Sequence, residues 1–518
     1  MLVNAKSLSP QDKVKDFVSI TPLLEKLRAE SKVIVQCHGV FDLLHPGHIR
    51  HFKEAKEQGD ILVVTLTPDK YVNKGPGRPV FNEQLRLESI ASLDYVDFAV
   101  LNDSPDAVTA INRIHPNIYV KGKEYENFNK DVTQKITLEK LAVESCQGKI
   151  YFTDDVVFSS SSLLNQFFDP YPKGVQKFLK QVKEKFSFED ILKKITAFSD
   201  LKVLVVGDAI VDIYQYVNPL GQSGKGQHMV AACKEKEVFL GGSLIVANHL
   251  AEFTSNVKLV TALGYDCGYR SFIHQNINTN VEADFCKSSE MQTLIKKRYV
   301  LKDGESLVKL FETYTSNQNI LDKKGVKNFQ QKIIEQAKDV DLVLVCDFGN
   351  GLLIPEIMQT LTKLPNFLCL NTQINSGNRG FNAVTQYERA DYISLNEPEI
   401  RLAVHDRFSD IEKITKKLQE KLPFQFLSIT RGVNGAFCVD RKNQKKTEIP
   451  ALNIHAIDRV GAGDSFFAIS SLAAKMKLPI ELVGLLGSIA AALDVQIVGN
   501  KEPVKKTHFL KYLTRLMK

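Results

Sequence analysis

The most informative stretch of this sequence reads CHGVFDLLHPGH and covers residues 37–48. The apolar segment 33–36 before it predicts a strand, and the segment 49–58 after it predicts a helix. A helix N-terminus presents free backbone N–H groups and partial positive charge, both of which suit a phosphate. Gly39 and Gly47 would let the backbone approach such a ligand closely. The stretch therefore predicts an anion site where a strand meets a helix.

Two histidines, His45 and His48, lie on the turn that enters this expected helix. Imidazole groups there can donate hydrogen bonds to phosphate oxygens and stabilise a pentavalent phosphorus without a covalent step. The alternatives are a metal pair and a capped helix in which the histidines are incidental. Zinc-binding histidines on a helix usually have i, i+4 spacing with a glutamate as general base, whereas Pro46 and Gly47 separate these two at i, i+3. The spacing favours phosphate.

Strands and helices alternate through the first section of the chain, which runs to about residue 166. A helix is expected over 83–92, and further strands are expected over 61–67, 98–101, 117–120 and 150–152. Alternation at this spacing favours a parallel sheet. The segment DPYP at 169–172 then breaks the pattern, and 173–198 has the apolar spacing of one or two amphipathic helices.

A second and larger α/β sheet is expected from residue 201 onward. Its strands are predicted over 203–206, 258–261, 342–346, 367–370, 392–395 and 426–430. Two pieces look antiparallel instead, 209–240 and 294–312, and the second contains an Asp303-Gly304 turn. We expect these pieces to form a small sheet added to the main layer. The predicted domains are 1–168 and 199–518, joined by a helical linker over 169–198.

A second candidate site is the segment DRVGAGDSF at 458–466, directly before an apolar helix. The small residues Gly461, Ala462 and Gly463 would expose consecutive N–H groups to a phosphate. Asp464 would face the same phosphate, where it can accept a hydroxyl proton. The pattern is weak by itself, because an aspartate at a helix start is usually a cap.

The composition narrows the class of protein. Of 518 residues, 44% are hydrophobic and 25% are charged, which is typical of a soluble globular protein with two or more domains. No apolar run is long enough to predict a membrane-spanning helix, and 485–498 is expected to be a buried helix. No secretory signal is visible at the N-terminus. Eight single cysteines without a Cys-x-x-Cys pair fit a reducing compartment, so we expect a cytoplasmic location.

The formal net charge of +7 is concentrated in two segments, 173–198 and 505–518. A nucleic-acid groove would need basic residues across a domain face. The charge therefore favours solvated helix faces, and we expect neither a nucleic acid nor a membrane as partner.

The first section resembles the nucleotidyltransferase superfamily that contains cytidylyltransferases and the adenylyltransferase of ADP-heptose synthesis. Five motifs carry the resemblance in order: GVFDLLHPGH at 39–48, TPD at 67–69, GRPV at 77–80 with Arg86, VKGKEY at 120–125, and SSSSLL at 159–164. The last motif usually ends in a basic residue, and Asn165 stands here.

The resemblance implies transfer of a nucleoside monophosphate from a nucleoside triphosphate to a phosphorylated acceptor, with release of pyrophosphate. It implies that His45, His48 and Lys121 are catalytic. It also implies nucleotide or phosphate contacts by Gly39, Phe41, Asp42, Asp69, Arg78, Ser159, Ser160 and Ser161.

The second section resembles PfkB-type, ribokinase-like kinases, and in particular the kinase of bifunctional ADP-heptose synthase. Besides the 458–466 segment, the motifs are NEPE at 396–399, TRGVNGA at 430–436, GDAIVD at 207–212 and Gly241-Gly242. The resemblance implies that Asp464 is the catalytic base. It implies a magnesium site at Asn396 and Glu399, nucleotide contacts by Thr430, Gly432, Gly461, Ala462 and Gly463, and sugar contacts by Asp208, Asp212, Gly241, Gly242 and Asp347.

Three departures from the kinase pattern are visible. Ile245 stands where an asparagine is usual, Arg459 replaces a threonine, and NTQ at 371–373 replaces Asp-Pro-x. An unusual segment, INSGNRG at 374–380, follows. These departures predict altered sugar recognition. The order of the two domains is also the reverse of that in the familiar bifunctional enzyme.

The resemblances together imply an α/β protein of two domains, a Rossmann-like nucleotidyltransferase sheet followed by a ribokinase-like α/β/α sandwich with a small β lid. They imply a bifunctional sugar-phosphate kinase and sugar-1-phosphate nucleotidyltransferase that makes an NDP-activated sugar for surface polysaccharide. Mg²⁺ and ATP or CTP are the expected cofactor and substrate, and the resemblance to kinases whose lids pair implies a homo-oligomer through the lid. Two alternatives stay open: a CTP-using polyol- or sugar-phosphate cytidylyltransferase whose kinase has altered specificity, and a silent kinase domain that serves as a sugar-binding module or regulator.

Overall fold

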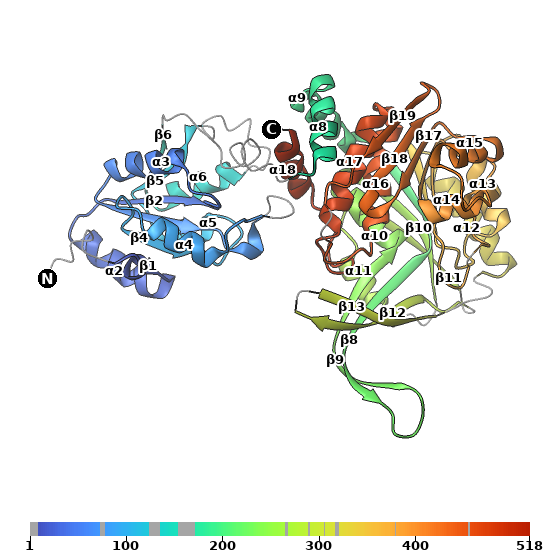
Figure 1. The fold of residues 1–518 in the computed structure, drawn as a ribbon, viewed down its shortest axis with the longest axis horizontal. Coiled ribbons are helices and arrows are strands. Elements are labelled where there is room, and N and C mark those ends of the chain that lie inside the picture. Colours follow the sequence, from blue (N-terminus) through green and yellow to red (C-terminus); the bar gives the residue numbers. More distant parts are fainter. Residues whose placement is uncertain are drawn as a thin grey trace. The chain divides into compact units, whose positions relative to one another are not determined.

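The computed structural model describes residues 9–72, 78–123, 135–153, 171–264, 268–288, 291–304, 306–315, 321–378, 380–453 and 456–517. The chain forms two compact units, residues 1–170 and 171–509, and the last residues are divided between them (Figure 1). Within the described ranges, no helix is long and apolar enough to cross a membrane.

The first unit contains a six-stranded sheet in which all neighbouring strands are parallel. Its spatial order is β1-β4-β3-β2-β5-β6. The strands are β1 (Val14–Lys15), β2 (Ile34–Gly39), β3 (Ile61–Leu66), β4 (Phe98–Leu101), β5 (Ile118–Gly122) and β6 (Lys149–Thr153). The parallel sheet predicted from the alternating pattern is confirmed, whereas β1 was not predicted.

Helices pack on both faces of this sheet. They are α1 (Pro10–Lys13), α2 (Phe17–Ala29), α3 (Pro46–Glu57), α4 (Glu83–Ala91), α5 (Val108–Ile114) and α6 (Lys135–Ser145). Leu62 and Val64 of β3 share a buried cluster with residues of α3 and α4, while Val63 faces Ile20 and Leu24 of α2. Alternate strand residues therefore face opposite layers, which explains why the strands read as continuous apolar runs.

The order of strands reverses direction between β2 and β5. The chain moves from β2 to β3 on one side, and β5 pairs with β2 on the other. In open parallel sheets, ligands bind outside the carboxyl ends of the strands at such a switch point. The loop that holds His45 and His48 follows β2 and so begins at this place.

The second unit contains a nine-stranded main sheet of order β11-β10-β7-β14-β15-β16-β17-β18-β19. Its strands are β7 (Lys202–Gly207), β10 (Asn256–Gly264), β11 (Val281–Ser288), β14 (Leu342–Asp347), β15 (Phe367–Thr372), β16 (Tyr392–Asn396), β17 (Phe426–Thr430), β18 (Ala436–Asp440) and β19 (Lys445–Ile449). The strands from β11 to β17 are parallel, and β18 and β19 are antiparallel. All six predicted strands are present, and β11, β18 and β19 were missed.

Helices cover the main sheet on both faces (Figure 1). One buried cluster joins the sheet to α12 (Lys323–Gln336), α13 (Pro355–Thr362), α14 (Glu397–Ala403) and α15 (Ile411–Lys421). The other helices of this unit are α8 (Lys173–Lys185), α9 (Phe188–Thr196), α10 (Ser243–Ala251), α11 (Arg270–Asn276), α16 (Ala462–Lys475) and α17 (Ile480–Asp494). Helix α18 (Lys506–Met517) contains residues of both units. The segment predicted as one or two connecting helices is thus α8 and α9, within the second unit. The buried helix predicted over 485–498 is α17, which begins five residues earlier.

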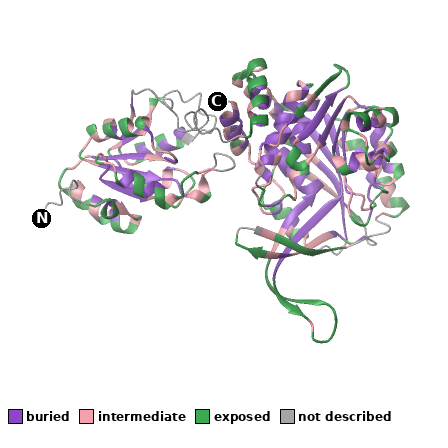
Figure 2. Cartoon of the chain, viewed as in Figure 1, coloured by how far each residue is buried: buried purple, intermediate pink, exposed green. Residues whose placement is uncertain are grey.

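A separate four-stranded sheet, called the lid sheet below, has the order β13-β12-β8-β9. Its strands are β8 (Ala209–Gln222), β9 (Met229–Gly242), β12 (Leu294–Asp303) and β13 (Ser306–Tyr314). The pairs β8–β9 and β12–β13 are antiparallel, as predicted, and β8 runs parallel to β12. Gly304 makes the turn between β12 and β13 with a φ of 59°, which glycine adopts without strain. The far end of the β8–β9 arm is exposed (Figure 2).

Candidate active sites

The two histidines of the first unit lie next to each other at the start of α3. His45 is the residue that caps this helix, and its Nδ1 accepts a hydrogen bond from the Gly47 backbone N–H at 3.2 Å. The neutral His45 ring therefore carries its hydrogen on Nε2, where it can donate to an anion. The His45 and His48 ring centroids are 3.9 Å apart, so both imidazoles can address one ligand.

Phe41 shapes the backbone of the same loop. Its φ is 46°, in the left-handed region, and its ring packs edge-on against His48 at 5.3 Å. A Cβ built on Gly39 would lie 2.8 Å from the Phe41 ring. A side chain at position 39 would collide with the Phe41 ring, so sterics explain why this predicted phosphate-site residue is a glycine.

Asp42 and Arg78 are bound to each other. The Asp42 carboxylate is buried and accepts hydrogen bonds from Arg78 Nε and from the Val80 backbone N–H, the latter at 2.6 Å. The Arg78 side chain is itself almost fully buried. In this structure the predicted nucleotide-binding pair therefore anchors the loop before α4.

A second ion pair lies beside it. Arg86 is buried, and it donates to Asp69 Oδ1 at 2.7 Å, to the Thr67 carbonyl at 2.9 Å and to the Val40 carbonyl. Asp69 and Glu83 each accept from the other's backbone N–H at 2.9 Å. Arg86 thus joins the loops that follow β2 and β3.

Lys121 lies near the end of β5 and pairs with Glu139 of α6, with Nζ and Oε2 2.8 Å apart. Burial, assisted by the Lys121 charge, lowers the pKa of His51 to about 4, so His51 is neutral at physiological pH. Glu139 was not predicted as a site residue, since nothing in the neighbouring sequence marks it. Ser159, Ser160 and Ser161, like Gly77 and residues 124–125, lie outside the described residues.

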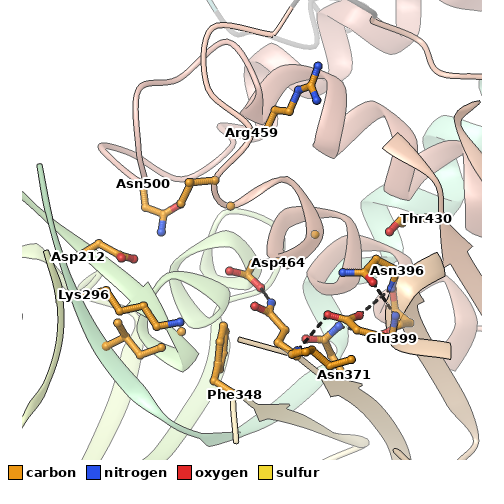
Figure 3. A pocket seen from close by; sticks show the side chains of 18 of the residues that line it. Asp212, Lys296, Phe348, Asn371, Asn396, Glu399, Thr430, Arg459, Asp464 and Asn500 are labelled. Carbon is orange, nitrogen blue, oxygen red and sulfur yellow. Dashed lines mark hydrogen bonds between the residues drawn. The ribbon is translucent and has the colours of Figure 1, made fainter. Parts of the chain in front are cut away.

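A pocket of about 270 Å³ opens in the second unit (Figure 3). It lies at the carboxyl ends of three neighbouring strands, where Asn371 of β15, Asn396 of β16 and Thr430 of β17 contribute to its wall. The lid sheet and the turn before α16 complete it. The sequence-predicted residues that line it are Asp212, Gly242, Asn396, Glu399, Thr430, Gly461, Gly463 and Asp464.

Asp464 lies in the first turn of α16 and faces this pocket (Figure 3). Burial raises the pKa of its carboxyl to about 7, against the opposing effects of the Lys296 charge and a hydrogen bond from Gln373. The Gln373 Nε2 donates to Asp464 Oδ1 at 2.7 Å. A carboxyl with a pKa near neutrality is well matched to accept a proton from a hydroxyl group.

The backbone before Asp464 requires glycine. Gly461 has a φ of 95°, and a Cβ built on it would lie 2.2 Å from Asn500 Oδ1. A Cβ on Gly463 would meet no described atom within 4 Å, so this backbone borders open space. Gly461 and Gly463 line the pocket, and Ala462 between them is the first residue of α16 but does not line it. The N-terminal end of this helix therefore borders the pocket, an arrangement that suits phosphate.

Asn396 and Glu399 cap α14. The Asn396 side chain accepts from the Glu399 backbone N–H at 2.9 Å, and the Glu399 side chain accepts from the Asn396 backbone N–H at 2.7 Å (Figure 3). Burial raises the pKa of Glu399 to about 7, so a nearby cation would stabilise its charge.

These two residues fit magnesium carried by a nucleotide. No group of three or more His, Cys, Asp and Glu side chains that could hold a metal occurs among the described residues. Mg²⁺ usually keeps several waters and binds through one or two carboxylates together with substrate phosphates. Oxygen ligands from Asn396 and Glu399 beside a phosphate cradle meet that requirement.

Two predicted sugar-contacting aspartates do not line the pocket. Asp208 accepts from the Phe348 backbone N–H at 2.9 Å, and burial together with the Asp347 charge raises its pKa to about 7. Asp347 accepts from Tyr387 Oη at 2.9 Å and Asn382 Nδ2 at 3.1 Å. Both carboxylates are buried below the strand ends and support the turn that carries Phe348, which does line the pocket.

The remaining predicted residues have steric or local roles in this structure. A Cβ on Gly241 would lie 2.2 Å from Asp212 Oδ2, and Gly242 has a φ of 61°. Gly432 begins the 3₁₀ turn 432–434 with a φ of 57°, outside the pocket wall. Ile245 is buried in α10 and does not line the pocket.

The lid sheet contributes two cations that the sequence analysis missed. Arg298 pairs with Asp212 and, at 3.1 Å, with Glu312. Lys296 Nζ lies 5.3 Å from the centre of the Phe348 ring. Both residues are on β12 and line the pocket. Their i, i+2 spacing on a predicted strand was the available signal, because such residues share a face.

Asp458, the first residue of the candidate segment 458–466, connects the lid sheet to the turn before α16, a role that was not predicted. It accepts hydrogen bonds from Tyr214 Oη at 2.5 Å, from Lys309 Nζ at 2.6 Å and from the Gly499 backbone N–H at 2.9 Å. Tyr214 is on β8 and Lys309 is on β13. Asp458 thus fixes the lid sheet beside the Gly461–Gly463 cradle.

Comparison with known proteins gives two family matches. Residues 200–507 match the pfkB family carbohydrate kinases, and residues 37–167 match the cytidylyltransferase-like family. The order, with the kinase-like part second, is the one expected from the sequence.

Among curated relatives, the bifunctional protein HldE of Syntrophotalea carbinolica is 32% identical over 171 residues, which are 32% of this chain and 34% of that protein. HldE of Koribacter versatilis is 27% identical over 322 residues, 61% of this chain and 63% of that protein. The matched region thus spans about a third of the first of these relatives and less than two thirds of the second.

Among solved structures, phosphofructokinase-2 from Escherichia coli in complex with substrates and products has a TM-score of 0.49 at 13% identity, covering 61% of this chain and 100% of that chain. Ribokinase of Arabidopsis thaliana complexed with ribose and ATP has a TM-score of 0.45 at 18% identity, covering 61% of this chain and 99% of that chain.

Proposed function

The chain belongs to the pfkB family of carbohydrate kinases, and on that premise we propose that its second unit phosphorylates a sugar phosphate with ATP. We further propose that the first unit joins a nucleotide to a sugar 1-phosphate and releases pyrophosphate. The kinase product carries two phosphates, so a separate phosphatase would have to remove one of them between the two reactions. The product would be an NDP-activated sugar of the ADP-heptose type, and the reactions would take place in the cytoplasm. The domains of this proposal are 1–168 and 199–518, with 169–198 as the connecting segment.

The observation that carries the kinase proposal is Asp464, a buried carboxyl at a helix N-terminus inside a polar pocket. Its raised pKa, about 7, supports a role as the base that takes the proton of a sugar hydroxyl. The N–H groups of residues 461–463 would stabilise charge on the transferred phosphoryl group. Magnesium, held at Asn396 and Glu399, would neutralise the triphosphate.

Lys296 and Arg298 support an anionic substrate. Both line the pocket from the lid strand β12. Arg298 is already balanced by Asp212 and Glu312, whereas no carboxylate pairs with Lys296 among the described residues. An ammonium group near the base that has no ion-pair partner among the described residues would attract a phosphate that the sugar already carries.

The nucleotidyltransferase proposal depends on the neighbouring strands β2 and β5. The His45 and His48 imidazoles follow the first, and Lys121 lies at the end of the second. This arrangement supports binding of a triphosphate at the switch point of the sheet. Asp42, Arg78 and Asp69 would then act by holding the surrounding loops, as their ion pairs suggest.

The test uses the purified full chain with two separate readouts. Magnesium-ATP with D-glycero-D-manno-heptose 7-phosphate should give a product heavier by one phosphate in mass spectrometry. Magnesium-ATP or magnesium-CTP with the corresponding heptose 1-phosphate should release pyrophosphate. Asp464→Asn should abolish only the first reaction and His45→Ala only the second, so each variant is the control for the other.

The outcomes separate the candidate functions. Pyrophosphate release with CTP alone would favour a cytidylyltransferase. If the second unit binds sugar phosphates but phosphorylates none of those tried, the kinase assignment is contradicted. This result would favour a sugar-binding module.

We also propose a homo-oligomer through the lid sheet. The exposed arm of β8 and β9 presents the apolar side chains of Leu220 and Met229, at 68% and 71% exposure, and exposed apolar side chains that lie together can mark a protein–protein contact. Light scattering of the full chain should give at least twice the monomer mass, and Leu220→Ser with Met229→Ser should lower it. A monomer at micromolar concentration would contradict this proposal.

A further inference from the structure

We propose that Gln373 is a positioning residue for Asp464 and that the asparagine-rich segment 375–382 holds Gln373 in place. This inference depends on the kinase function proposed above and deepens it. It concerns the part of the chain that departs most from the kinase pattern, the NTQINSGNRG segment at 371–380.

The contact between the two side chains is direct. Gln373 Nε2 donates to Asp464 Oδ1 at 2.7 Å, across 91 positions of sequence. Both residues line the pocket, and Asp464 is only 7% exposed. A hydrogen bond from a neutral amide to a carboxylate is stronger in such a place than in water. The bond occupies one carboxylate oxygen and leaves Oδ2 to face a substrate hydroxyl.

The main chain of Gln373 is held on both sides. Its N–H donates to the Asp347 carbonyl at 2.7 Å. Its carbonyl accepts from Asn382 Nδ2 at 3.1 Å and from Asn378 Nδ2 at 3.3 Å. Each of these groups belongs to β14 or to the segment after Gln373, so the residue has little freedom to turn away from Asp464.

The segment after Gln373 is in turn fastened to the loop that follows β14. Asn375 Nδ2 and Asn378 Nδ2 donate to the Phe348 carbonyl at 3.0 and 2.9 Å. Gly349 allows this approach, because a Cβ there would lie 2.0 Å from Asn378 Nδ2. Three asparagines thus use their side-chain amides on backbone carbonyls around a single glutamine, which explains the composition of this segment.

The orientation of Asp464 matters for the reaction. The proton of the sugar hydroxyl goes to Asp464 Oδ2, the sugar oxygen bonds to the γ-phosphorus of ATP, and the bond from that phosphorus to the bridging oxygen breaks. The electron pair of the broken bond leaves with ADP. A misplacement of about 1 Å at such a centre can cost on the order of 100-fold in rate. Gln373 acts through Asp464, so it should influence turnover and not substrate binding.

The test compares three variants of the full chain in steady-state kinase assays. Gln373→Met keeps length and volume but removes the donor, and we expect kcat to fall about 10- to 100-fold with both KM values within about twofold. Gln373→Lys places an ammonium donor at a similar distance from the backbone, and its kcat should be about tenfold higher than that of Gln373→Met. The matched control is Gln331→Ala, because Gln331 makes the same amide-to-carboxylate bond, to Glu335 at 2.7 Å, on the exposed face of α12. It should leave both parameters unchanged.

Two results would overturn the inference. One is a Gln373→Met variant that keeps its kcat within twofold. The other is a raised KM for the sugar phosphate with kcat kept, which would make Gln373 a substrate contact.

A stability cycle separates this inference from the proposed function. The unfolding equilibrium is measured for wild type, Gln373→Met, Asp464→Ala and the double variant. We expect the unfolding equilibrium constant of the double variant to differ by at least about threefold from the value that the two single variants would give if their effects were independent. Additive changes would refute the contact even in a chain without kinase activity. If the two changes are coupled but the chain transfers no phosphate, the contact between Gln373 and Asp464 is upheld. The kinase function, and with it the positioning role of Gln373 in catalysis, is then refuted.

Discussion

The most demanding prediction concerns the replacement Asp464→Asn, which should abolish kinase activity and at the same time stabilise the protein. Asp464 is 7% exposed, and burial raises its pKa from the ordinary 3.8 to about 7. The folded state therefore prefers the protonated carboxyl, and above pH 7 it holds a buried charge at a cost. Asparagine resembles the protonated form and removes that cost.

The magnitude follows from the same two pKa values. The interval between 3.8 and about 7, at about 1.4 kcal/mol per pKa unit, gives an upper bound of about 4 kcal/mol at pH 8. The sign is that of a group with a raised folded pKa: stability is lost as the pH rises from 3.8 through 7. The advantage of the variant should therefore be absent near pH 4 and largest at pH 8. Relaxation and water penetration around a buried charge reduce its cost, so we expect Asp464→Asn to raise the free energy of unfolding by about 1–3 kcal/mol at pH 8.

The assay is urea unfolding of wild type and variant without ligands at pH 5, 6, 7 and 8. Asp458→Asn is the matched control of opposite sign. Burial alone would raise the pKa of Asp458, but hydrogen bonds from Lys309 and Tyr214 hold it below its ordinary value. Its replacement should destabilise the protein at all four pH values. An Asp464→Asn variant whose advantage does not grow with pH would refute the reasoning.

Three further predictions concern activity. Kinase turnover should fall about tenfold between pH 8 and pH 6, because a base with a pKa of about 7 loses its charge over that range; a flat profile would show that Asp464 is not the titrating base. Gly461→Ala should reduce phosphoryl transfer more than 100-fold, since its Cβ would lie 2.2 Å from Asn500 Oδ1 at a φ of 95°, and normal kcat would contradict the steric argument. Lys309→Met should raise the KM of the kinase substrate several-fold, because it releases β13 of the lid sheet from Asp458 and leaves only the bond from Tyr214 of β8. Pyrophosphate release by the first unit, measured as the control, should not change.

Much of the architecture was predictable because it depends on local patterns. The apolar runs that became β2, β3 and β14 are buried on both faces, and parallel strands of that kind are recognisable without any partner. The Asp303-Gly304 turn predicted the β12–β13 hairpin, since the turn type is set by the residues of the turn. Among the missed strands of the main sheet, β11 and β19 lie at its two edges, and the lysines and glutamate of the largely exposed β19 hide a strand pattern. The buried β18 follows β17 after only a short turn.

The candidate sites divide in the same way. His45, Asp464 and Asn396 were predictable because each belongs to a short motif at the start of a helix, and the free N–H groups of that helix end are a local property. The individual roles of Gln373, Lys296 and Asp458 were not predicted, although Gln373 and Asp458 lie in segments that the sequence pattern singles out. Their importance comes from contacts with residues far along the chain, and no spacing in the sequence encodes which distant side chain a loop will meet.

The amino-acid order alone thus specified two α/β layers, the helix starts that can bind phosphate, and the carboxyl group that can accept a proton. The strand order of each sheet decided which side chains from distant parts of the chain lie together. Because β15 and β16 are neighbours in the main sheet, Asn371 and Asn396 share one pocket, and because β12 pairs with β8, Arg298 reaches Asp212. Hydrogen bonds and ion pairs act over only a few ångströms, so the function of these residues depends on which strands the fold brings side by side.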